Sequence, residues 1–282
     1  MAYNLLKKVT NCPIEKIPVD LNIRDFCCVD EDLFIVHDNG IALMRDGELD
    51  MGWINSVAFM EFPEMTSFSS ICYNKDRQCL YIVSDGGCRI YSLCLQLMNF
   101  EPVFSQEDVD MLKKKYIGCK NSETHISSSK DMIVWSVKDS HRCFQVISQR
   151  PLPLVGCGRS GFSLSTPVNS RICHPTGVTI MENVFCYSDC GNEYIRGIQG
   201  SSSFVVIGGC KNLGTVHYAN KRLYFLSDNI IHMLSPEGNT KHLFEVYRGG
   251  EIQSFCPSNK NCIYILEKKN GRTKKDEGDQ ST

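Results

Sequence analysis

The chain has 282 residues, with 30 Lys and Arg against 32 Asp and Glu and a formal net charge of −2 at pH 7. This composition argues against charge-driven binding to nucleic acid or an anionic membrane, although it leaves a local basic patch open. No apolar run approaches the roughly 18 residues that span a bilayer, and Lys7 and Lys8 stand where a secretory signal needs apolar residues. We therefore expect a soluble, untargeted protein of the cytoplasm, with the nucleus as the alternative location and no membrane partner.

Sixteen cysteines are spread along the chain, mostly inside apolar runs such as "FCCV" and "VFCY". Cysteine in such places behaves as a small hydrophobic residue. The sequence also has no Asn-x-Ser/Thr glycosylation acceptor, which a secreted chain of this length often carries. Reduced thiols in an intracellular compartment are therefore favoured over a disulfide framework.

One phrase recurs along the chain: a short apolar run that ends in Asp, a tight polar turn and a second apolar run. Five copies begin at residues 32, 79, 132, 183 and 222, and a shortened sixth begins at residue 262. The turn aspartates are Asp38, Asp85, Asp139, Asp189 and Asp228. Their intervals of 47, 54, 50 and 39 residues are close to the length of one propeller blade.

Each copy is typical of a β-hairpin, because runs rich in Val, Ile, Tyr and Phe form strands and Asn-Gly or Gly-Gly supplies a tight reversal. A single hairpin cannot bury its apolar faces, whereas six arranged radially can. The sequence therefore predicts an all-β, six-bladed β-propeller. One short helical insertion is expected near residues 105–116, where Ser105 is an N-cap and lysines end the helix.

The two ends of the chain are expected to meet. The sixth copy lacks its second apolar run, and "KIPVDLNIRD" near the N-terminus places Ile17, Val19, Leu21 and Ile23 in alternation with polar or proline residues. We predict that this N-terminal strand closes a single propeller domain over residues 1–268, and that the charged segment 269–282 is a disordered tail. A chain cut short relative to a longer parent is the alternative.

A GxGxxG pattern at Gly156, Gly158 and Gly161 raises the question of a nucleotide site. A dinucleotide site needs a strand before these glycines and a helix after them. Here "RPLPLV" precedes them and the Ser- and Pro-rich "FSLSTPVNSRICHP" follows. No helix can begin there, so the pattern is not expected to bind phosphate.

The residues after these glycines resemble an NHL-repeat β-propeller. In that family a glycine-rich lead-in and an apolar residue precede a His/Asn-Pro-x-Gly-Val/Ile phrase, an Asp-x-Gly-Asn turn and an Ile-Arg-x-Ile strand. Residues 156–209 supply this pattern, with a weaker match in the second repeat. The matching positions after the lead-in are Phe162, His174, Pro175, Gly177, Val178, Asp189, Gly191, Asn192, Ile195, Arg196 and Ile198.

Most of these motif residues have structural explanations. Gly177 and Gly191 are expected to tolerate unusual backbone angles, and Asp189 is expected to cap the amides of its turn. The other repeated aspartates occupy the same hairpin position in each blade, which favours turn capping over a calcium site in the manner of propeller hydrolases. Cys173 and His174 have no second pair at zinc-site spacing, and no Gly-x-Ser-x-Gly elbow or Walker loop occurs. We expect no metal, no cofactor and no catalytic residue, although a Cys/His nucleophile stays open.

Two segments are candidates for partner binding. Lys113, Lys114 and Lys115 form a compact basic cluster, and the apolar segment 50–65 carries Trp53, Phe59 and Phe62. The resemblance implies a scaffold or substrate-recognition module, in some relatives within ubiquitin-ligase assemblies, but this sequence has no RING-type array of its own. We therefore expect a non-catalytic protein-interaction adaptor, within a multi-subunit complex. RNA binding is the alternative, followed by a calcium-dependent hydrolase.

Overall fold

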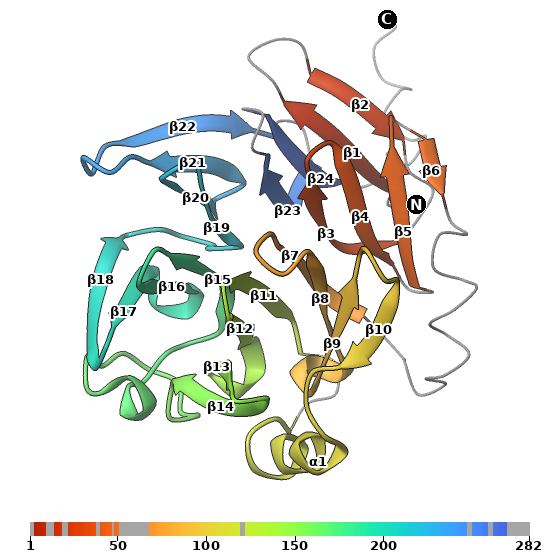
Figure 1. Cartoon of the computed structure of the whole chain (residues 1–282). Helices are drawn as coiled ribbons and strands as arrows, with labels where there is room; N and C mark the ends of the chain where they lie inside the picture. The colour runs from red at the N-terminus through yellow and green to blue at the C-terminus, as the bar shows by residue number, and fades with distance from the viewer. Residues whose placement is uncertain are drawn as a thin grey trace, which may run out of the picture.

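The computed structural model describes residues 3–9, 14–18, 22–37, 40–46, 48–50, 68–118, 122–246, 250–258 and 262–269. Six four-stranded antiparallel sheets are arranged as the blades of a propeller around one axis (Figure 1). This confirms the predicted all-β, six-bladed fold. Asp38, Trp53, Phe59 and Phe62 lie outside the described residues, as does most of the predicted tail.

The first five blades each use four strands that are consecutive in the chain. Blades 1 and 2 consist of β3 (Ile23–Val29), β4 (Asp32–His37), β5 (Gly40–Arg45), β6 (Glu48–Asp50), β7 (Phe68–Asn74), β8 (Cys79–Ser84), β9 (Arg89–Cys94) and β10 (Asn99–Pro102). Blades 3 and 4 consist of β11 (Thr124–Ser129), β12 (Met132–Val137), β13 (Arg142–Ile147), β14 (Arg150–Val155), β15 (Pro175–Met181), β16 (Val184–Asp189), β17 (Tyr194–Gln199) and β18 (Ser202–Gly208). Blade 5 consists of β19 (Val216–Ala219), β20 (Arg222–Ser227), β21 (Ile230–Leu234) and β22 (Thr240–Glu245).

Blade 6 is built from both ends of the described chain. Its sheet order is β2-β1-β24-β23, so β23 (Gly250–Pro257) and β24 (Ile263–Lys269) form the inner half. The outer half consists of β1 (Tyr3–Val9) and β2 (Ile14–Pro18), and β1 pairs antiparallel with β24 over its whole length. The N-terminal segment therefore joins the last blade and closes the ring (Figure 1).

The strand that meets β24 differs from the predicted one. The sequence prediction assigned the closing strand to the alternating residues Ile17 to Ile23, but residues 3–9 make this pairing and Ile17 lies in the outermost strand β2. Ile23 instead begins the innermost strand of blade 1. The alternation in "KIPVDLNIRD" therefore spans the passage from one blade to the next, and periodicity alone does not show where one strand ends.

The hydrophobic core is divided into six sectors, one between each pair of adjacent blades. The sector that joins blade 1 to blade 6 packs Phe26, Leu33 and Ile35 against Tyr264 and Leu266, all buried. Because each blade buries both of its faces against neighbours, its middle strands carry consecutive buried residues, as in β4 and β8. Loss of any one blade would expose two sectors.

The helix α1 (Gln106–Lys115) lies between blades 2 and 3 and confirms the predicted insertion. The side chain of Ser105 accepts a hydrogen bond from the Asp108 amide at 3.2 Å, as the N-cap expectation requires. Val109 and Leu112 are buried in the sector that also holds Trp135. The described residues also contain four short 3₁₀ helices: η1 (Asp85–Gly87), η2 (Lys138–Ser140), η3 (Pro167–Asn169) and η4 (Cys190–Asn192). Within the described ranges, no helix has the length and apolar character that crossing a membrane requires.

A buried ion pair joins the two ends of the described chain inside blade 6. Lys7 on β1 contacts Glu267 on β24, and the two side chains are only 10% and 1% exposed. The Lys7 ammonium also lies 5.5 Å from the ring centre of Phe244 in blade 5. Removing one partner of a buried pair leaves an uncompensated charge, which costs about 3–5 kcal/mol. The closure of the ring therefore depends on charge pairing as well as on strand pairing.

We predict that Lys7→Met lowers the free energy of unfolding by about 3–5 kcal/mol, because Glu267 then stays buried without its cation. The double variant Lys7→Met/Glu267→Gln should lose less than the sum of the two single changes. Lys8→Met, on the same strand, is the matched control with an expected loss below about 1 kcal/mol. Urea denaturation of the four variants and the wild type measures these values. Additive single effects would contradict the ion pair between Lys7 and Glu267.

Candidate functional site

A buried polar network occupies the two middle strands of blade 4 and the turn between them, at the residues of the sequence motif. The Arg196 guanidinium donates to Asp189 Oδ2 at 3.0 Å, and both side chains are fully buried. Asp189 also accepts from the Asn192 side chain at 2.9 Å and from the Cys173 amide at 2.6 Å. Burial raises the pKa of Asp189, although these donors and the Arg196 charge oppose the shift. The network therefore ties the β16–β17 hairpin to the chain segment that precedes β15.

The same network shapes the loop of residues 156–174 that connects blades 3 and 4. Arg196 donates to the carbonyl oxygens of Arg171 at 3.0 Å and of Ser163 at 2.5 Å. Its guanidinium also lies 5.1 Å from the ring centre of Phe162. The glycine-rich segment that resembled a nucleotide loop is therefore a connection held against blade 4 by one buried arginine.

The structure corrects the roles predicted for three motif residues. Asp189 bonds to the amide of Cys173 and to two side chains, and its own turn has no side-chain cap. Neither Gly177 nor Gly191 has a positive φ. A Cβ at Gly177 would lie 2.7 Å from the Val216 amide nitrogen, and one at Gly191 would lie 2.3 Å from Cys173 Sγ. Both glycines provide space for close packing and not backbone freedom, while Pro175 begins β15 opposite Asp189.

The remaining described repeat aspartates do not share one role. Asp85 pairs with Lys113 at 2.5 Å and lies 3.6 Å from Arg89. Asp228 accepts from the Asn212 side chain at 2.8 Å. The backbone amide of Asp139 donates a hydrogen bond to Ser122 Oγ. The structure also corrects the expectation of one shared hairpin position, because Asp189 ends β16 and pairs with Tyr194. Asp85 and Asp139 instead lie in the turns η1 and η2 that follow their strands.

The basic cluster predicted from sequence is partly neutralised. Lys113 is paired with Asp85, and the Lys115 ammonium lies 5.1 Å from the ring centre of Tyr116. All three lysines, including Lys114, lie in the last turn of α1. The structure therefore places them together, but with two of the three positive charges already engaged by neighbouring groups.

Exposed apolar side chains gather on blades 3 and 4. Within the described ranges, nine large hydrophobic residues are exposed, and eight of them come from these two blades and their connecting loop. The eight are Met132, Ile147, Leu152, Phe162, Leu164, Val168, Phe204 and Val205. Leu152 and Val168 line one pocket of about 420 Å³ together with Tyr116 and Arg142. A concentration of exposed apolar side chains in one region of a protein is typical of an interaction site.

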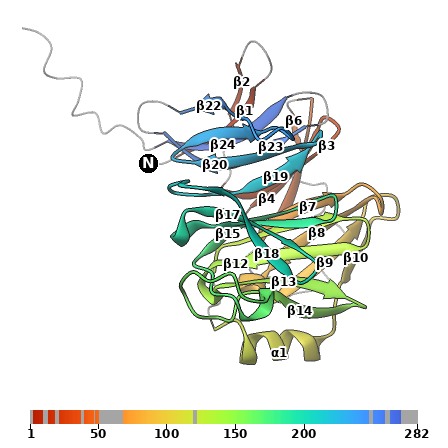
Figure 2. The ribbon, with the colours of Figure 1, turned by 90° about the vertical axis from the view of Figure 1, so that its left-hand side faces the viewer.

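The outer strand of blade 4 is an open sheet edge among the described strands, and its pairing with β17 contains one register shift. β18 pairs only with β17 among the described strands and lies at the rim of the ring (Figures 1 and 2). Its sequence "SSFVVIG" contains neither charge nor proline, whereas the outer strands of the other blades read "ELD", "NFEP", "RPLPLV", "TKHLFE" and "IEKIP". Charges, prolines and short length are the usual means by which proteins prevent an edge from pairing. Blade 4 alone lacks them.

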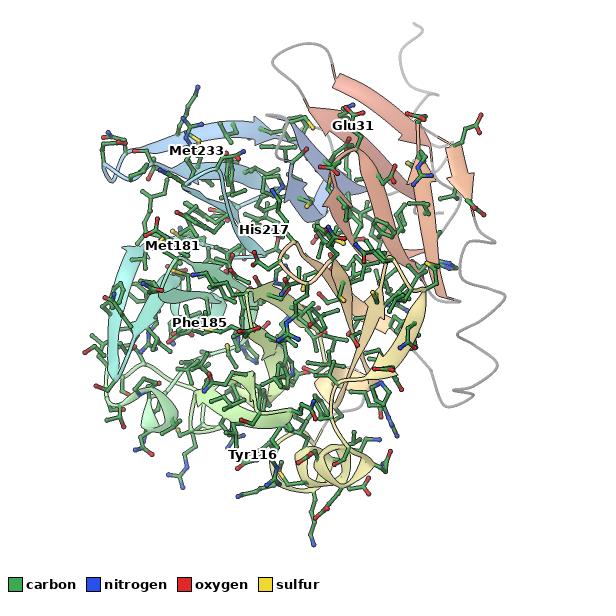
Figure 3. All side chains as sticks on the ribbon, in the orientation of Figure 1. Glu31, Tyr116, Met181, Phe185, His217 and Met233 are labelled. Carbon is green, nitrogen blue, oxygen red and sulfur yellow. The ribbon has the colours of Figure 1, made fainter. Side chains whose placement is uncertain are left out.

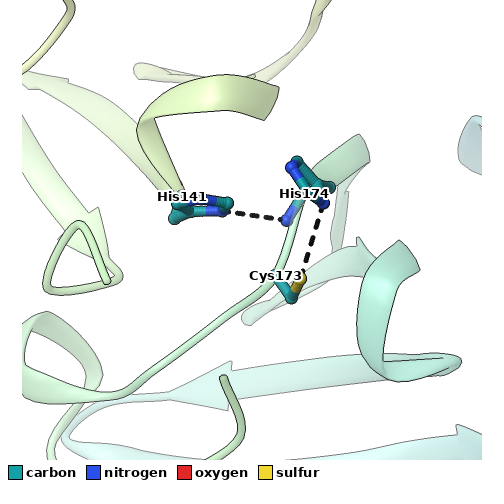
Figure 4. Close-up of side chains that lie close together, drawn as sticks. All are labelled: His141, Cys173 and His174. Atoms are coloured by element: carbon teal, nitrogen blue, oxygen red, sulfur yellow. Dashed lines mark hydrogen bonds between the residues drawn. The ribbon is translucent and has the colours of Figure 1, made fainter. Parts of the chain in front are cut away.

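Three possible metal ligands meet where blades 3 and 4 adjoin. His141 follows the η2 turn of blade 3, while Cys173 and His174 immediately precede β15 of blade 4 (Figure 4). One ligand atom from each residue lies within 4.8 Å of the other two. Burial, followed by the neighbouring His174, lowers the pKa of His141. Sequence reasoning missed this group because His141 belongs to the preceding repeat, 32 residues before Cys173.

Near the axis, the inner strands are tied to one another by side chains. Asp25 of blade 1 accepts from Ser70 Oγ at 2.6 Å and the Ile71 amide at 3.1 Å, both in blade 2, and from Ser254 Oγ of blade 6 at 3.0 Å. Further inner-strand side chains each accept an amide N–H from the next blade: Ser70 from Ile126, His125 from Val178, and Thr179 from Tyr218. This ring of bonds satisfies buried amides between blades, which an unsolvated sheet junction requires.

Two histidines belong to this axial ring, of which His125 is buried and His217 is partly buried. His125 and His217 stack edge to face with their ring centres 5.1 Å apart, and His217 also contacts Phe255. His217 lies near the centre of the ring in Figure 3. Burial lowers the pKa of His125, although Asp25 opposes the shift. Burial, with a smaller effect of His125, lowers the pKa of His217 well below its ordinary value. Both imidazoles are therefore neutral in the folded protein at neutral pH.

The fourteen cysteines within the described ranges are free thiols. Burial raises the pKa of Cys72 to about 12 and that of Cys88 to about 11, and it also raises that of Cys143. These three thiols remain protonated at neutral pH, which fits their packing role in the strands. Cys173 differs from them because it lies beside two histidines.

No family model matches the chain, and no curated protein matches its sequence. Several solved structures share the fold. Virginiamycin B lyase from Staphylococcus aureus is 12% identical with a TM-score of 0.56, over 93% of this chain and 87% of the lyase. A streptogramin B lyase is 9% identical with a TM-score of 0.58, over 95% and 89% of the two chains. A chain of a nidogen/laminin complex is 14% identical with a TM-score of 0.53, over 85% of this chain and 94% of that chain. At such identities the likeness shows the six-bladed fold alone.

The lowered pKa values of His125 and His217 predict a stability that falls in acid. In the unfolded chain these histidines bind protons below about pH 6.5, while their lowered folded pKa values keep them neutral. The unfolded state then holds more protons, so the free energy of unfolding decreases below about pH 6.5 by up to about 1.4 kcal/mol per histidine and pH unit. The substitution His217→Phe keeps an aromatic ring in contact with Phe255 but removes the imidazole that binds a proton. Urea denaturation between pH 7.5 and 5 should therefore give this variant a shallower slope than the wild type; parallel slopes would contradict the assignment.

Proposed function

We propose that this propeller is a non-catalytic module that binds another protein by pairing an extended segment of that protein with the edge of β18. The observation that carries the proposal is the contrast between β18 and the five other outer strands. An open edge offers rows of amide and carbonyl groups to an added strand, which gives affinity, while neighbouring side chains give specificity. Five edges carry charge or proline, and the sixth carries neither.

The surroundings of β18 favour a protein segment as the occupant. Phe204 and Val205 of β18 are 37% and 38% exposed, and the loop residues Phe162 and Leu164 add further exposed apolar surface beside blade 4. The Phe162 ring lies 5.1 Å from the ring of Tyr194, whose strand pairs directly with β18. Such rigid aromatic and aliphatic groups are typical anchors for protein side chains. A strand added to β18 would lie next to this apolar surface.

The family resemblance supports the same function. Residues 156–209 match the NHL-repeat pattern, whose members serve as scaffolds or recognition modules, and this chain is proposed to act in that way within a multi-subunit complex of the cytoplasm. One structure with the same fold belongs to a complex of nidogen with laminin. The proposal does not extend the lyase activity of the other similar structures to this chain, because those share only the fold.

The alternatives have less support. RNA binding would use the basic end of α1, where Lys113 is paired with Asp85 and Lys115 lies over Tyr116. A calcium-dependent hydrolase would need oxygen ligands, and the cluster of possible ligands found within the described ranges contains no carboxylate. Neither arrangement matches its chemistry as well as β18 matches strand addition.

We predict that Val205→Lys weakens partner binding at least tenfold, because a lysine on the edge disfavours the pairing of an added strand. Val205 is exposed, so the substitution should change the free energy of unfolding by no more than about 0.5 kcal/mol. Leu97→Lys is the matched control, since Leu97 is a highly exposed residue at the rim of blade 2. The wild type, Val205→Lys and Leu97→Lys are each used as bait for affinity capture. A protein that the wild type and Leu97→Lys both capture is then purified, and its affinity for each of the three is measured by titration.

The purified partner should bind Val205→Lys at least tenfold more weakly than the wild type, and nuclease treatment should not release it. Equal binding by Val205→Lys and wild type would contradict the proposal. Salt-sensitive retention of RNA that disappears when Lys113, Lys114 and Lys115 are replaced by Glu would favour the RNA alternative instead.

A further inference from the structure

We propose that His141, Cys173 and His174 form a binding site for a divalent transition metal, Zn²⁺ in the first place, at the junction of blades 3 and 4. This site is separate from the β18 edge and does not depend on the proposed function. It goes beyond the expectation, made from the sequence, that the chain binds no metal.

The spacing of the three ligand atoms suits a tetrahedral ion. Zn–S bonds of about 2.3 Å and Zn–N bonds of about 2.0–2.1 Å at tetrahedral angles place sulfur and nitrogen about 3.5 Å apart. Cys173 Sγ and His174 Nδ1 are 3.5 Å apart. The third residue, His141, has its ring centre 4.7 Å from that of His174, and all three ligand atoms lie within 4.8 Å of one another. Closure around a metal therefore needs a shift of about 1 Å by one imidazole.

The chemistry of the donors selects the kind of metal. One thiolate and two imidazoles suit Zn²⁺, Co²⁺ and related ions, whereas Ca²⁺ and Mg²⁺ require oxygen ligands. When the metal binds, the Cys173 thiol releases its proton to solvent and the thiolate takes its place as ligand. Three protein ligands leave one tetrahedral position for water, as in zinc sites with an open coordination position.

The backbone is already arranged to hold these side chains together. His141 and His174 both have left-handed backbone conformations, with φ of 50° each, which is uncommon for a residue other than glycine. At His174 this turn brings two consecutive side chains, Cys173 and His174, to the same side. Asp189 holds the Cys173 amide at 2.6 Å, and a Cβ at Gly191 would lie 2.3 Å from Cys173 Sγ. The buried network of blade 4 thus fixes the position of the thiol.

Two weaker contacts now occupy the ligand atoms. Ser160 Oγ donates to Cys173 Sγ at 3.1 Å, and the His174 amide donates to His141 Nδ1 at 3.2 Å. When His141 Nδ1 coordinates the metal, a metal–nitrogen bond replaces the hydrogen bond from the His174 amide. The Ser160 hydroxyl then donates its hydrogen bond to the Cys173 thiolate. Among the charged groups nearby, Asp139 and Asp189 favour a cation and Arg142 opposes one.

The site is tested by titrating the purified full-length chain, first stripped with a chelator, with Co²⁺ as a spectroscopic probe. We expect one Co²⁺ per chain, with a thiolate-to-metal charge-transfer band and the visible absorption of a tetrahedral site. Cys173→Ser should lose the charge-transfer band, and His141→Gln and His174→Gln should each bind at least tenfold more weakly. Cys157→Ser, in the same loop, is the matched control and should bind as the wild type does. Circular dichroism of each metal-free variant checks that it folds.

A second readout does not depend on the metal spectrum. Zn²⁺ should raise the melting temperature of the wild type and of Cys157→Ser but not that of Cys173→Ser, because a ligand of the folded state stabilises it. Zn²⁺ should also protect Cys173 from alkylation, as measured by peptide mass spectrometry. Absence of one-to-one binding, an unchanged charge-transfer band in Cys173→Ser, or unprotected alkylation of Cys173 would overturn the proposal.

Discussion

The burial of each blade between two neighbours is the constraint on which the rest of this protein depends. Among the described residues, no blade has a core of its own, because the apolar side chains meet in six sectors between adjacent blades. An open row of blades would expose the faces of the first and the last. The pairing of β1 with β24 removes both open faces at once, and the buried contact of Lys7 with Glu267 lies within that pairing.

This closed ring determines where function can reside. The inner strands are occupied by bonds between blades, such as those of Asp25 to Ser70 and Ser254, which leaves the outer edges and the connecting loops. Blade 4 is unusual in both places. Its edge β18 has neither charge nor proline, and its Arg196–Asp189 pair holds the preceding loop in position. The proposed strand-binding edge and the proposed metal site both depend on this one blade.

The sequence predicted the fold better than the site. The hairpins, the six-fold repeat and the Ser105-capped helix follow from local patterns, because strand and cap signals lie within a few residues of one another. The predicted closing strand was wrong, because Ile17 and Ile23 alternate as one strand would but belong to two different blades. The meeting of His141 with Cys173 and the role of Asp25 depend on contacts between blades, which no local spacing shows.

Hydrogen exchange of the backbone amides tests ring closure most directly. If β1 completes blade 6, its amides exchange only when the whole ring opens, so β1 (Tyr3–Val9) and β24 (Ile263–Lys269) should show the same high opening free energy as the inner strands. The protection of the β1 and β24 amides from exchange should therefore decline together as denaturant is added. Rapid exchange of β1 while β24 stays protected would contradict a ring closed by the N-terminal strand.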